Sequence, residues 1–155
     1  MSTVKPIPDG FHAATPYLCV KGGAEALDFY AKAFGGVEKS RMADPSGRIG
    51  HAEIWIGEAP IFLSDEHPEM GILGPKTLGG TSVGIHLYVE DVDAFTARAV
   101  AAGAKALRPV EDQFYGDRAG TLEDPFGHRW YVSTHKEDVS PDEMKRRAEK
   151  LYGAG

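Results

Sequence analysis

The same order of secondary-structure signals occurs twice in this chain, about 69 residues apart. Tyr17-Leu18-Cys19-Val20 aligns with His86-Leu87-Tyr88-Val89, and Gly35 and Gly103 fall within a residue of each other at the matching helix ends. In each copy an apolar strand precedes a helix and three further strands. A repeat of only two units excludes a solenoid, which needs several stacked repeats. The duplication therefore predicts an α+β fold made of two βαβββ modules.

Hydrophobic spacing and turn residues set the expected elements. Ala24, Leu27, Ala31 and Phe34 recur at helical spacing, and Gly35 ends that helix. The first copy is expected to hold a strand over 15–20, a helix over 24–34 and strands over 37–42, 50–56 and 60–64. The second is expected to hold a strand over 85–89, a helix over 92–102 and strands over 105–110, 118–122 and 129–134.

One domain over residues 1–155 fits the length of the chain. Residues 1–12 are expected to form an irregular arm, because Pro6, Pro8 and Gly10 interrupt any regular element. The first module is assigned to 13–66 and the second to 83–135. The segment 67–82 is rich in glycine and proline and is typical of a mobile linker or of a lid over a pocket. A helix is expected over 140–152, since Ser140-Pro141-Asp142-Glu143 is a helix-start pattern.

Composition excludes several classes of protein. The net charge is -6 and both signs are mixed along the chain, so no basic patch for nucleic acid is expected. The apolar runs are too short to span a bilayer, and the first residues lack the apolar stretch of a signal peptide. Cys19 is the only cysteine, which excludes an intrachain disulfide and a multi-cysteine zinc site. These features favour a cytoplasmic protein that binds a small molecule, without nucleic acid or membrane partners.

Strand alternation predicts which side chains share the face of each sheet that the helix does not cover. This face carries both polar and aromatic residues, a mixture that suits a ligand cavity better than a plain solvent face. Its expected members are Tyr17, His51, Glu53, Trp55, Phe62, His86, Tyr88, Tyr131 and His135.

Three segments resemble the glyoxalase/bleomycin-resistance/extradiol dioxygenase (vicinal oxygen chelate) superfamily. Ala26-Leu27-Asp28-Phe29-Tyr30 resembles the first helix of its modules, and Val89-Glu90-Asp91-Val92-Asp93 the strand-to-helix junction of the second. Asp124-Pro125-Phe126-Gly127-His128 is similar to the hairpin before its last strand. The resemblance covers about residues 13–135 and implies that the curved sheets of the two modules pair around a pocket. From Tyr88 to His135 it extends to the small bacterial branch labelled demethylubiquinone-methyltransferase-like, although no glycine-rich nucleotide loop supports that reaction.

The resemblance also implies where a metal is held in glyoxalase-type members. The four ligand positions fall on Thr15, Phe62, Gly84 and Tyr131, none of which is a good ligand for a divalent metal. Neither a metal nor another cofactor is therefore expected, and glyoxalase I chemistry and iron-dependent ring cleavage are disfavoured. An alternative is a metal-dependent lyase or isomerase whose site is relocated to His51, His86 and Glu53.

The leading hypothesis is a metal-free pocket that belongs either to an enzyme of altered chemistry or to a sequestering binder. His51 and Glu53 are the candidate acid–base residues. The alternative is that His51 and His86 are structural and only satisfy buried polar partners. Arg118 is either a clamp for a carboxylate or phosphate or a surface ion pair. The expected ligand-binding residues are Tyr17, Trp55, Phe62, His86, Tyr88, Tyr115, Arg118 and Tyr131. Members of this superfamily exchange modules between chains, so a homodimer is expected, with the pocket within one chain or across the dimer.

Overall fold

The computed structural model describes residues 3–153 and contains two four-stranded sheets, each with one long helix. Module 1 consists of β1 (Tyr17–Val20), α1 (Gly23–Phe34), β2 (Val37–Ala43), β3 (Ile49–Ile56) and β4 (Ala59–Asp65). Module 2 consists of β5 (Gly84–Tyr88), α3 (Val92–Ala102), β6 (Lys105–Asp112), β7 (Asp117–Glu123) and β8 (Arg129–His135). Both agree with the predicted order of elements, with shifts of one or two residues at several ends.

The two sheets share one topology. Their strand orders are β1-β4-β3-β2 and β5-β8-β7-β6, and in each the first strand runs parallel to the last. Tyr17 pairs with Phe62 in module 1, and His86 pairs with Tyr131 in module 2. These pairs occupy equivalent places in the two copies. The α+β class and the duplicated βαβββ architecture are confirmed.

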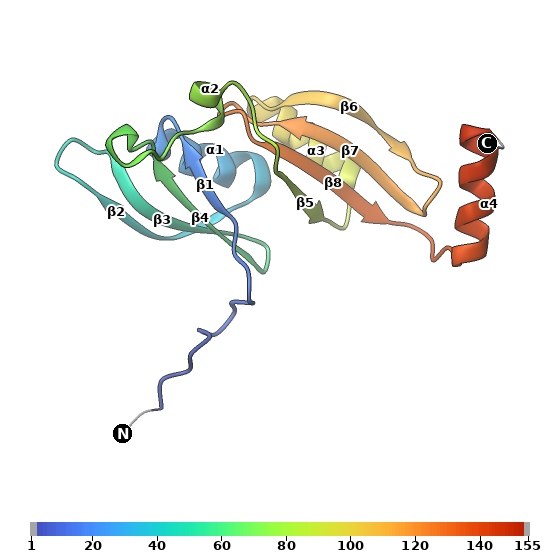
Figure 1. Cartoon of the computed structure of the whole chain (residues 1–155), viewed down its shortest axis with the longest axis horizontal. Helices are drawn as coiled ribbons and strands as arrows, with labels where there is room; N and C mark the ends of the chain where they lie inside the picture. The colour runs from blue at the N-terminus through green and yellow to red at the C-terminus, as the bar shows by residue number, and fades with distance from the viewer. Residues whose placement is uncertain (1–2, 154–155) are drawn as a thin grey trace.

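The modules lie side by side, and α1 packs against α3 where they meet (Figure 1). Aromatic rings fill this junction. The ring of Phe34 stacks on Phe95 with centroids 5.3 Å apart and lies 4.8 Å from the ring of Trp130. Because Phe34 belongs to module 1 and the other two to module 2, the modules share one hydrophobic core.

Asp124 joins the same junction through four hydrogen bonds, although its side chain is almost fully buried. Its Oδ2 accepts from the Tyr30 hydroxyl at 2.5 Å and from Trp130 Nε1 at 2.8 Å. Its Oδ1 accepts from the backbone N–H groups of Phe126 and His128. Burial, reinforced by the Asp124 carboxylate, raises the pKa of Tyr30 well above its ordinary value, so the phenol stays a donor.

The segment between the modules is folded onto them. It contains η1 (Pro68–Met70) and α2 (Pro75–Leu78), where the sequence predicted a mobile linker or a lid. Glu66 Oε1 accepts from the backbone N–H of Gly74 and from the Thr77 hydroxyl, and buried Pro75 packs against Gly127 of module 2. These contacts hold α2 against β1 and against the turn that precedes β8.

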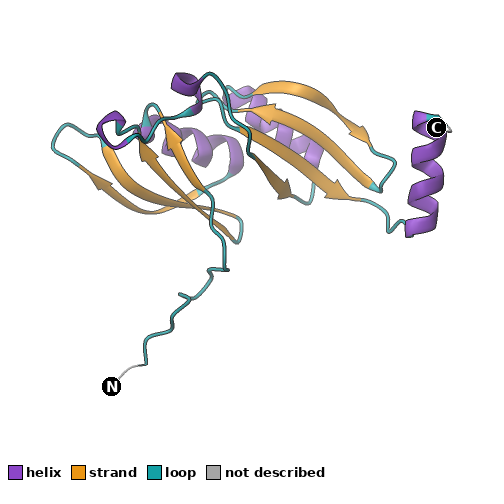
Figure 2. Ribbon diagram, in the orientation of Figure 1, coloured by secondary structure: helices purple, strands orange, loops and turns teal. Residues whose placement is uncertain are grey.

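The two ends of the described chain project from the modules (Figure 2). α4 (Pro141–Tyr152) begins where Ser140 accepts from the backbone N–H of Glu143, as the helix-start pattern predicted. Arg147 ties this helix to Glu137 and to the carbonyl oxygen of Phe114. Within residues 3–153, no helix combines the length and the apolar character needed to cross a membrane.

Candidate functional site

The non-helix face of module 1 carries a cluster of rings from three strands. The Tyr17 hydroxyl lies 2.6 Å from His51 Nδ1, and the Phe62 ring lies 4.9 Å from the His51 ring and 5.6 Å from the Tyr17 ring. Burial raises the pKa of the Tyr17 phenol, so at neutral pH the hydroxyl keeps its proton, and its hydrogen bond to the imidazole occupies Nδ1. His51 therefore keeps Nε2 available for a ligand.

Trp55 extends this cluster along β3. Its indole Nε1 donates to Glu53 Oε1 at 2.5 Å, and Lys39 Nζ lies 5.7 Å from its ring centroid. Phe11 of the N-terminal arm lies between Trp55 and Phe62, with both centroid distances at 5.7 Å. We call Tyr17, His51, Glu53, Trp55 and Phe62 the module 1 face.

The corresponding surface of module 2 carries His86, Tyr88, Tyr131 and Ser133, which we call the module 2 face. The His86 ring stacks on Tyr88 with centroids 4.8 Å apart, and His86 Nε2 lies 3.0 Å from Ser133 Oγ. The Tyr88 hydroxyl donates to Asp117 Oδ2 at 2.8 Å. Ser133 is fully buried in the structure, so its hydroxyl serves as the hydrogen-bond partner of His86.

His135 lies at the edge of this face between two carboxylates. Its Nδ1 is 2.7 Å from Asp117 Oδ1 and its Nε2 is 2.8 Å from Asp138 Oδ1. The hydrogen bond to Asp138, together with that to Asp117, raises the pKa of His135 above its ordinary value. The protonated imidazole donates from both nitrogens and connects β8 to the segment that precedes α4.

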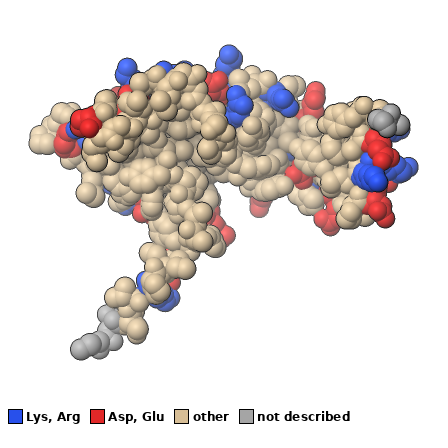
Figure 3. Space-filling model, viewed as in Figure 1, with Lys and Arg blue, Asp and Glu red and all other residues tan. Residues whose placement is uncertain are grey.

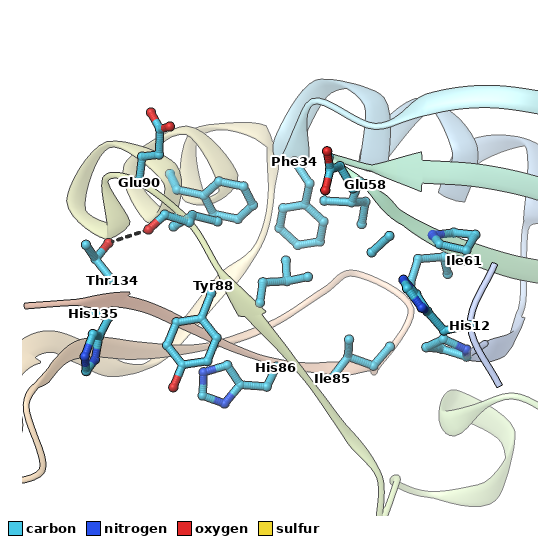
Figure 4. Close-up of a pocket in the computed structure, with 18 of the residues that line it drawn as sticks. His12, Phe34, Glu58, Ile61, Ile85, His86, Tyr88, Glu90, Thr134 and His135 are labelled. Carbon is cyan, nitrogen blue, oxygen red and sulfur yellow. Dashed lines mark hydrogen bonds between the residues drawn. The ribbon is translucent and has the colours of Figure 1, made fainter. Parts of the chain in front are cut away.

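A cavity of about 1090 Å³ lies between the two modules (Figure 4). Its walls are largely apolar, and its polar groups come from both modules. Figure 4 shows Phe34 and Glu58 of module 1 on one side, and His86, Tyr88 and His135 of module 2 on the other. Other lining residues include His12, Ile61, Ile85, Leu87, Glu90 and Phe95. A second hollow of about 330 Å³ on module 2 is lined by Tyr115 and Tyr131 together with His86 and Ser133.

Most of the site residues expected from the sequence thus fall into two groups. Tyr17, His51, Glu53, Trp55 and Phe62 share the module 1 face. His86, Tyr88, Tyr115 and Tyr131 lie together on module 2. Within residues 3–153, no hydrogen bond or ring contact joins a member of one group to a member of the other.

Arg118 lies apart from both groups. It forms a two-pronged ion pair with Asp93 of α3, with Nε 2.8 Å from Oδ2, and a further pair with Asp112. These contacts put the Arg118 guanidinium on the helix side of the second sheet. Successive side chains of β7 point to opposite faces, and the neighbouring Asp117 points to the other face, where it bonds to Tyr88. The contacts with Asp93 and Asp112 are the ones that the ion-pair interpretation of Arg118 expects, and its role as a ligand clamp stays a prediction.

Sequence reasoning missed Asp117, Glu58, Glu90 and His12, and it placed His135 on the non-helix face without counting it among the ligand-binding residues. Alternation along β7 was a usable signal for Asp117, which precedes Arg118 and must point to the opposite face. Nothing in the local sequence indicated the other residues, because their proximity depends on how the two modules pack.

The metal positions implied by the superfamily resemblance do not fit a metal here. A Cβ at Gly84 would overlap the ring of Tyr131. The space that a metal-binding side chain at position 84 would need is therefore filled by Tyr131, which stands at another of the four ligand positions. Phe62, at a third position, packs against Tyr17, His51 and Phe11. The part of the chain that the structure describes holds no group of three His, Cys, Asp or Glu side chains that could bind a metal ion. The relocated set His51, Glu53 and His86 is not brought together within one chain.

The face of the molecule drawn in Figure 3 is charged mainly at its margins. Figure 3 shows Lys, Arg, Asp and Glu along the upper edge of the modules and on α4, around a broad uncharged area. Uncharged and aromatic surface, together with a few convergent polar groups, is the usual composition of a site for a small organic molecule.

Comparison with known proteins places this geometry in a family. The chain is 43% identical to the Mycobacterium bovis protein Mb0911c over 136 residues, which cover 86% of this chain and 90% of that protein. The crystal structure of PA1353 from Pseudomonas aeruginosa matches with a TM-score of 0.64 and 25% identity, over 82% of this chain and all of that one. A Bacillus cereus PhnB protein, described as a putative 3-demethylubiquinone-9 3-methyltransferase, shares the fold with a TM-score of 0.60 and 17% identity, over 79% of this chain and 99% of that one. A family model matches residues 11–132, and the chain belongs to the Glyoxalase/Bleomycin resistance protein/Dioxygenase superfamily.

Proposed function

We propose that this protein binds a small organic molecule without a metal, in the cavity between its modules and against the module 2 face. One observation carries the proposal: the Tyr131 ring fills the space over Gly84, so aromatic surface replaces a metal ligand beside His86. The cavity volume is close to the upper end of the range for small-molecule sites, about 300–1,000 Å³.

The lining supports an amphipathic ligand. Phe34, Ile85 and Phe95 offer apolar contact, and Glu58 and Glu90 place two carboxylates among the lining residues. Since both carboxylates are exposed and neither forms an ion pair within residues 3–153, they favour a ligand with a positive charge or hydrogen-bond donors. The stacked rings of His86 and Tyr88 supply a flat surface for an unsaturated group.

The contacts favour a binder over an enzyme. Glu53 is engaged by the Trp55 indole and His135 by two carboxylates, so neither is a free base. His51 remains the candidate acid–base residue, because its Nε2 is available and Tyr17 orients its ring. Changing His51 to Ala distinguishes the two roles: an enzyme loses turnover while it keeps binding, and a binder changes only its affinity.

A second copy of the chain is proposed to cover the open faces. Tyr17 and Tyr88 are 55% and 65% exposed, an unusual state for aromatic residues grouped on sheet faces. A two-fold dimer that places the module 1 face of one protomer over the module 2 face of its partner covers both. Light scattering during gel filtration tests this arrangement. The proposed compartment is the cytoplasm, which suits a chain with a single cysteine.

Thermal-shift screening of small organic compounds, with EDTA present, tests the proposed function. At least one compound class is expected to stabilise the wild-type protein, and Tyr88→Ala is expected to reduce its affinity about tenfold or more. Tyr152→Ala is the matched control, since Tyr152 is an exposed tyrosine on α4, away from the cavity. Stabilisation that disappears with EDTA, or that Tyr88→Ala leaves unchanged, would contradict the proposal.

A further inference from the structure

The N-terminal arm places one side chain on the module 1 face. Phe11 is half-buried, and its ring meets Trp55 edge-on at 87° and Phe62 at 41°. The neighbouring residues Lys5, Asp9, His12 and Ala13 are exposed. The arm thus contacts the module 1 face mainly through one phenyl ring.

Glycine at position 10 makes this contact possible. Its φ of +82° favours glycine, and a Cβ there would overlap the Trp55 ring. The backbone therefore lies directly against the indole, and Phe11 is directed toward Phe62. This is a close fit between the arm and the two rings.

No hydrogen bond fastens the arm to the module 1 face. Within the described chain, the hydrogen bonds of residues 3–14 join arm residues to each other: Lys5 Nζ to Asp9 Oδ1, and the Phe11 N–H to the Pro8 carbonyl. Lifting the arm therefore breaks van der Waals contacts only, those of the Phe11 ring and of the backbone at Gly10. The cost is the exposure of one half-buried phenyl ring and of the surface beneath it.

The rings beneath Phe11 are held by contacts of their own. Trp55 is fixed by its hydrogen bond to Glu53, with Lys39 near its ring, and Phe62 packs against Tyr17 and His51. The space between Trp55 and Phe62 thus keeps its shape when Phe11 leaves. Preformed sites of this kind bind with little loss of side-chain entropy.

We propose that the space between Trp55 and Phe62 is a binding subsite for an aromatic ring of the ligand, and that Phe11 occupies it when no ligand is bound. This inference rests on the proposed small-molecule function and extends it to a second recognition element. The rings of Tyr17 and His51, both of which carry polar groups, pack against Phe62, so a ring that carries a polar substituent matches the subsite best. Phe11 then acts as an internal competitor that lowers the apparent affinity of the ligand.

Benzyl alcohol and its saturated counterpart cyclohexylmethanol are the probes that test this subsite. The indole N–H resonance of Trp55 in a ¹H–¹⁵N spectrum reports binding, and Trp130, fully buried and bonded to Asp124, serves as the internal reference. The shift of the Trp55 resonance gives the dissociation constant of benzyl alcohol. Benzyl alcohol is expected to bind about tenfold more tightly to Phe11→Ala than to the wild type. Cyclohexylmethanol is expected to bind more weakly than benzyl alcohol in the same variant.

Two further variants separate displacement of the arm from other effects. Gly10→Ala removes the close approach to Trp55 and is expected to tighten benzyl alcohol binding as Phe11→Ala does. Val4→Ala is the control, because Val4 is 86% exposed, and it is expected to behave as the wild type. Equal or weaker binding in Phe11→Ala, or an unmoved Trp55 resonance, would overturn the inference.

These results are independent of the screen for the proposed function. A tighter Trp55 response in Phe11→Ala supports the subsite even if no compound stabilises the wild-type cavity. Stabilising compounds that leave Trp55 unmoved in Phe11→Ala support the cavity and contradict the subsite.

Discussion

The phenol ring of Tyr131 lies over Gly84 so closely that a Cβ at position 84 would overlap it. The two residues belong to β8 and β5, which run parallel and adjacent in the second sheet. One of them has no side chain, and the other fills the space that a side chain would take. The pair therefore acts as a unit in packing, on the same face as His86.

Changing Gly84 to Ala is expected to destabilise the protein by about 1–3 kcal/mol, because the added methyl group forces the Tyr131 ring out of place. Urea denaturation measures the change. Gly50→Ala is the matched control: Gly50 also lies in a strand, but the nearest atom to its Cβ would be 3.8 Å away. The free energy of unfolding of the Gly50→Ala variant is expected to stay within about 0.5 kcal/mol of the wild-type value.

A double-mutant cycle checks that the cause is steric. In a Tyr131→Ala background the methyl group at position 84 meets no ring, so its cost is expected to disappear. An equal cost of Gly84→Ala in both backgrounds would show that the two residues do not interact.

The buried carboxylate of Asp124 is expected to hold the two modules together. Tyr30→Phe removes one of its four donors and is expected to cost about 1–3 kcal/mol, since a buried acceptor loses a partner. Asp124→Ala leaves the Trp130 indole and the Tyr30 hydroxyl without their acceptor and is expected to cost more than Tyr30→Phe. Urea denaturation tests both variants, with Tyr152→Phe as a control at an exposed tyrosine. Equal stability of Tyr30→Phe and Tyr152→Phe would contradict this role.

His135 gives the protein a pH-dependent contact. The carboxylates of Asp138 and Asp117 raise its pKa, so the folded protein binds this proton more tightly than the unfolded chain does. The resulting stabilisation is fully present below the ordinary histidine pKa, near 6.5, and is lost as pH rises through the raised value.

NMR titration of the His135 ring is expected to give a pKa above 6.5 and a lower pKa in Asp138→Asn. The stability difference between the wild type and His135→Gln is expected to shrink as pH rises. Tyr88 also bonds to Asp117, but its pKa is raised from an ordinary value of 10.0, so it does not titrate in the pH range of His135. A His135 pKa that does not respond to Asp138→Asn would refute the arrangement.

Most of the fold could be predicted from the sequence because its signals are local and occur twice. Alternation along β3 placed His51, Glu53 and Trp55 on one face, and the equivalent register of Tyr17 with Phe62 and His86 with Tyr131 follows from the duplication. The caps at Asp91 and Ser140 were predictable because each side chain bonds a backbone N–H only three residues away.

The remaining features depend on contacts between distant segments. No pattern near Phe11 indicates that it lies on Trp55, and nothing near Phe34 indicates that it meets Phe95 at the edge of the cavity. The segment 67–82 was expected from its composition to be a linker or a lid, and the contact of its Pro75 with Gly127 depends on a residue far away in the sequence. Arg118 was assigned two roles because its partner Asp93 lies on another element.

The most direct test of the metal-free site is ligand binding after exhaustive dialysis against EDTA. A compound found by screening is titrated by calorimetry into the dialysed protein, before and after zinc, nickel, manganese or iron is added back. Because the Tyr131 ring fills the space over Gly84, we expect EDTA and each added metal to leave the affinity unchanged. Binding that appears only with one equivalent of a metal, and is lost in His86→Ala, would contradict it and favour a relocated metal centre.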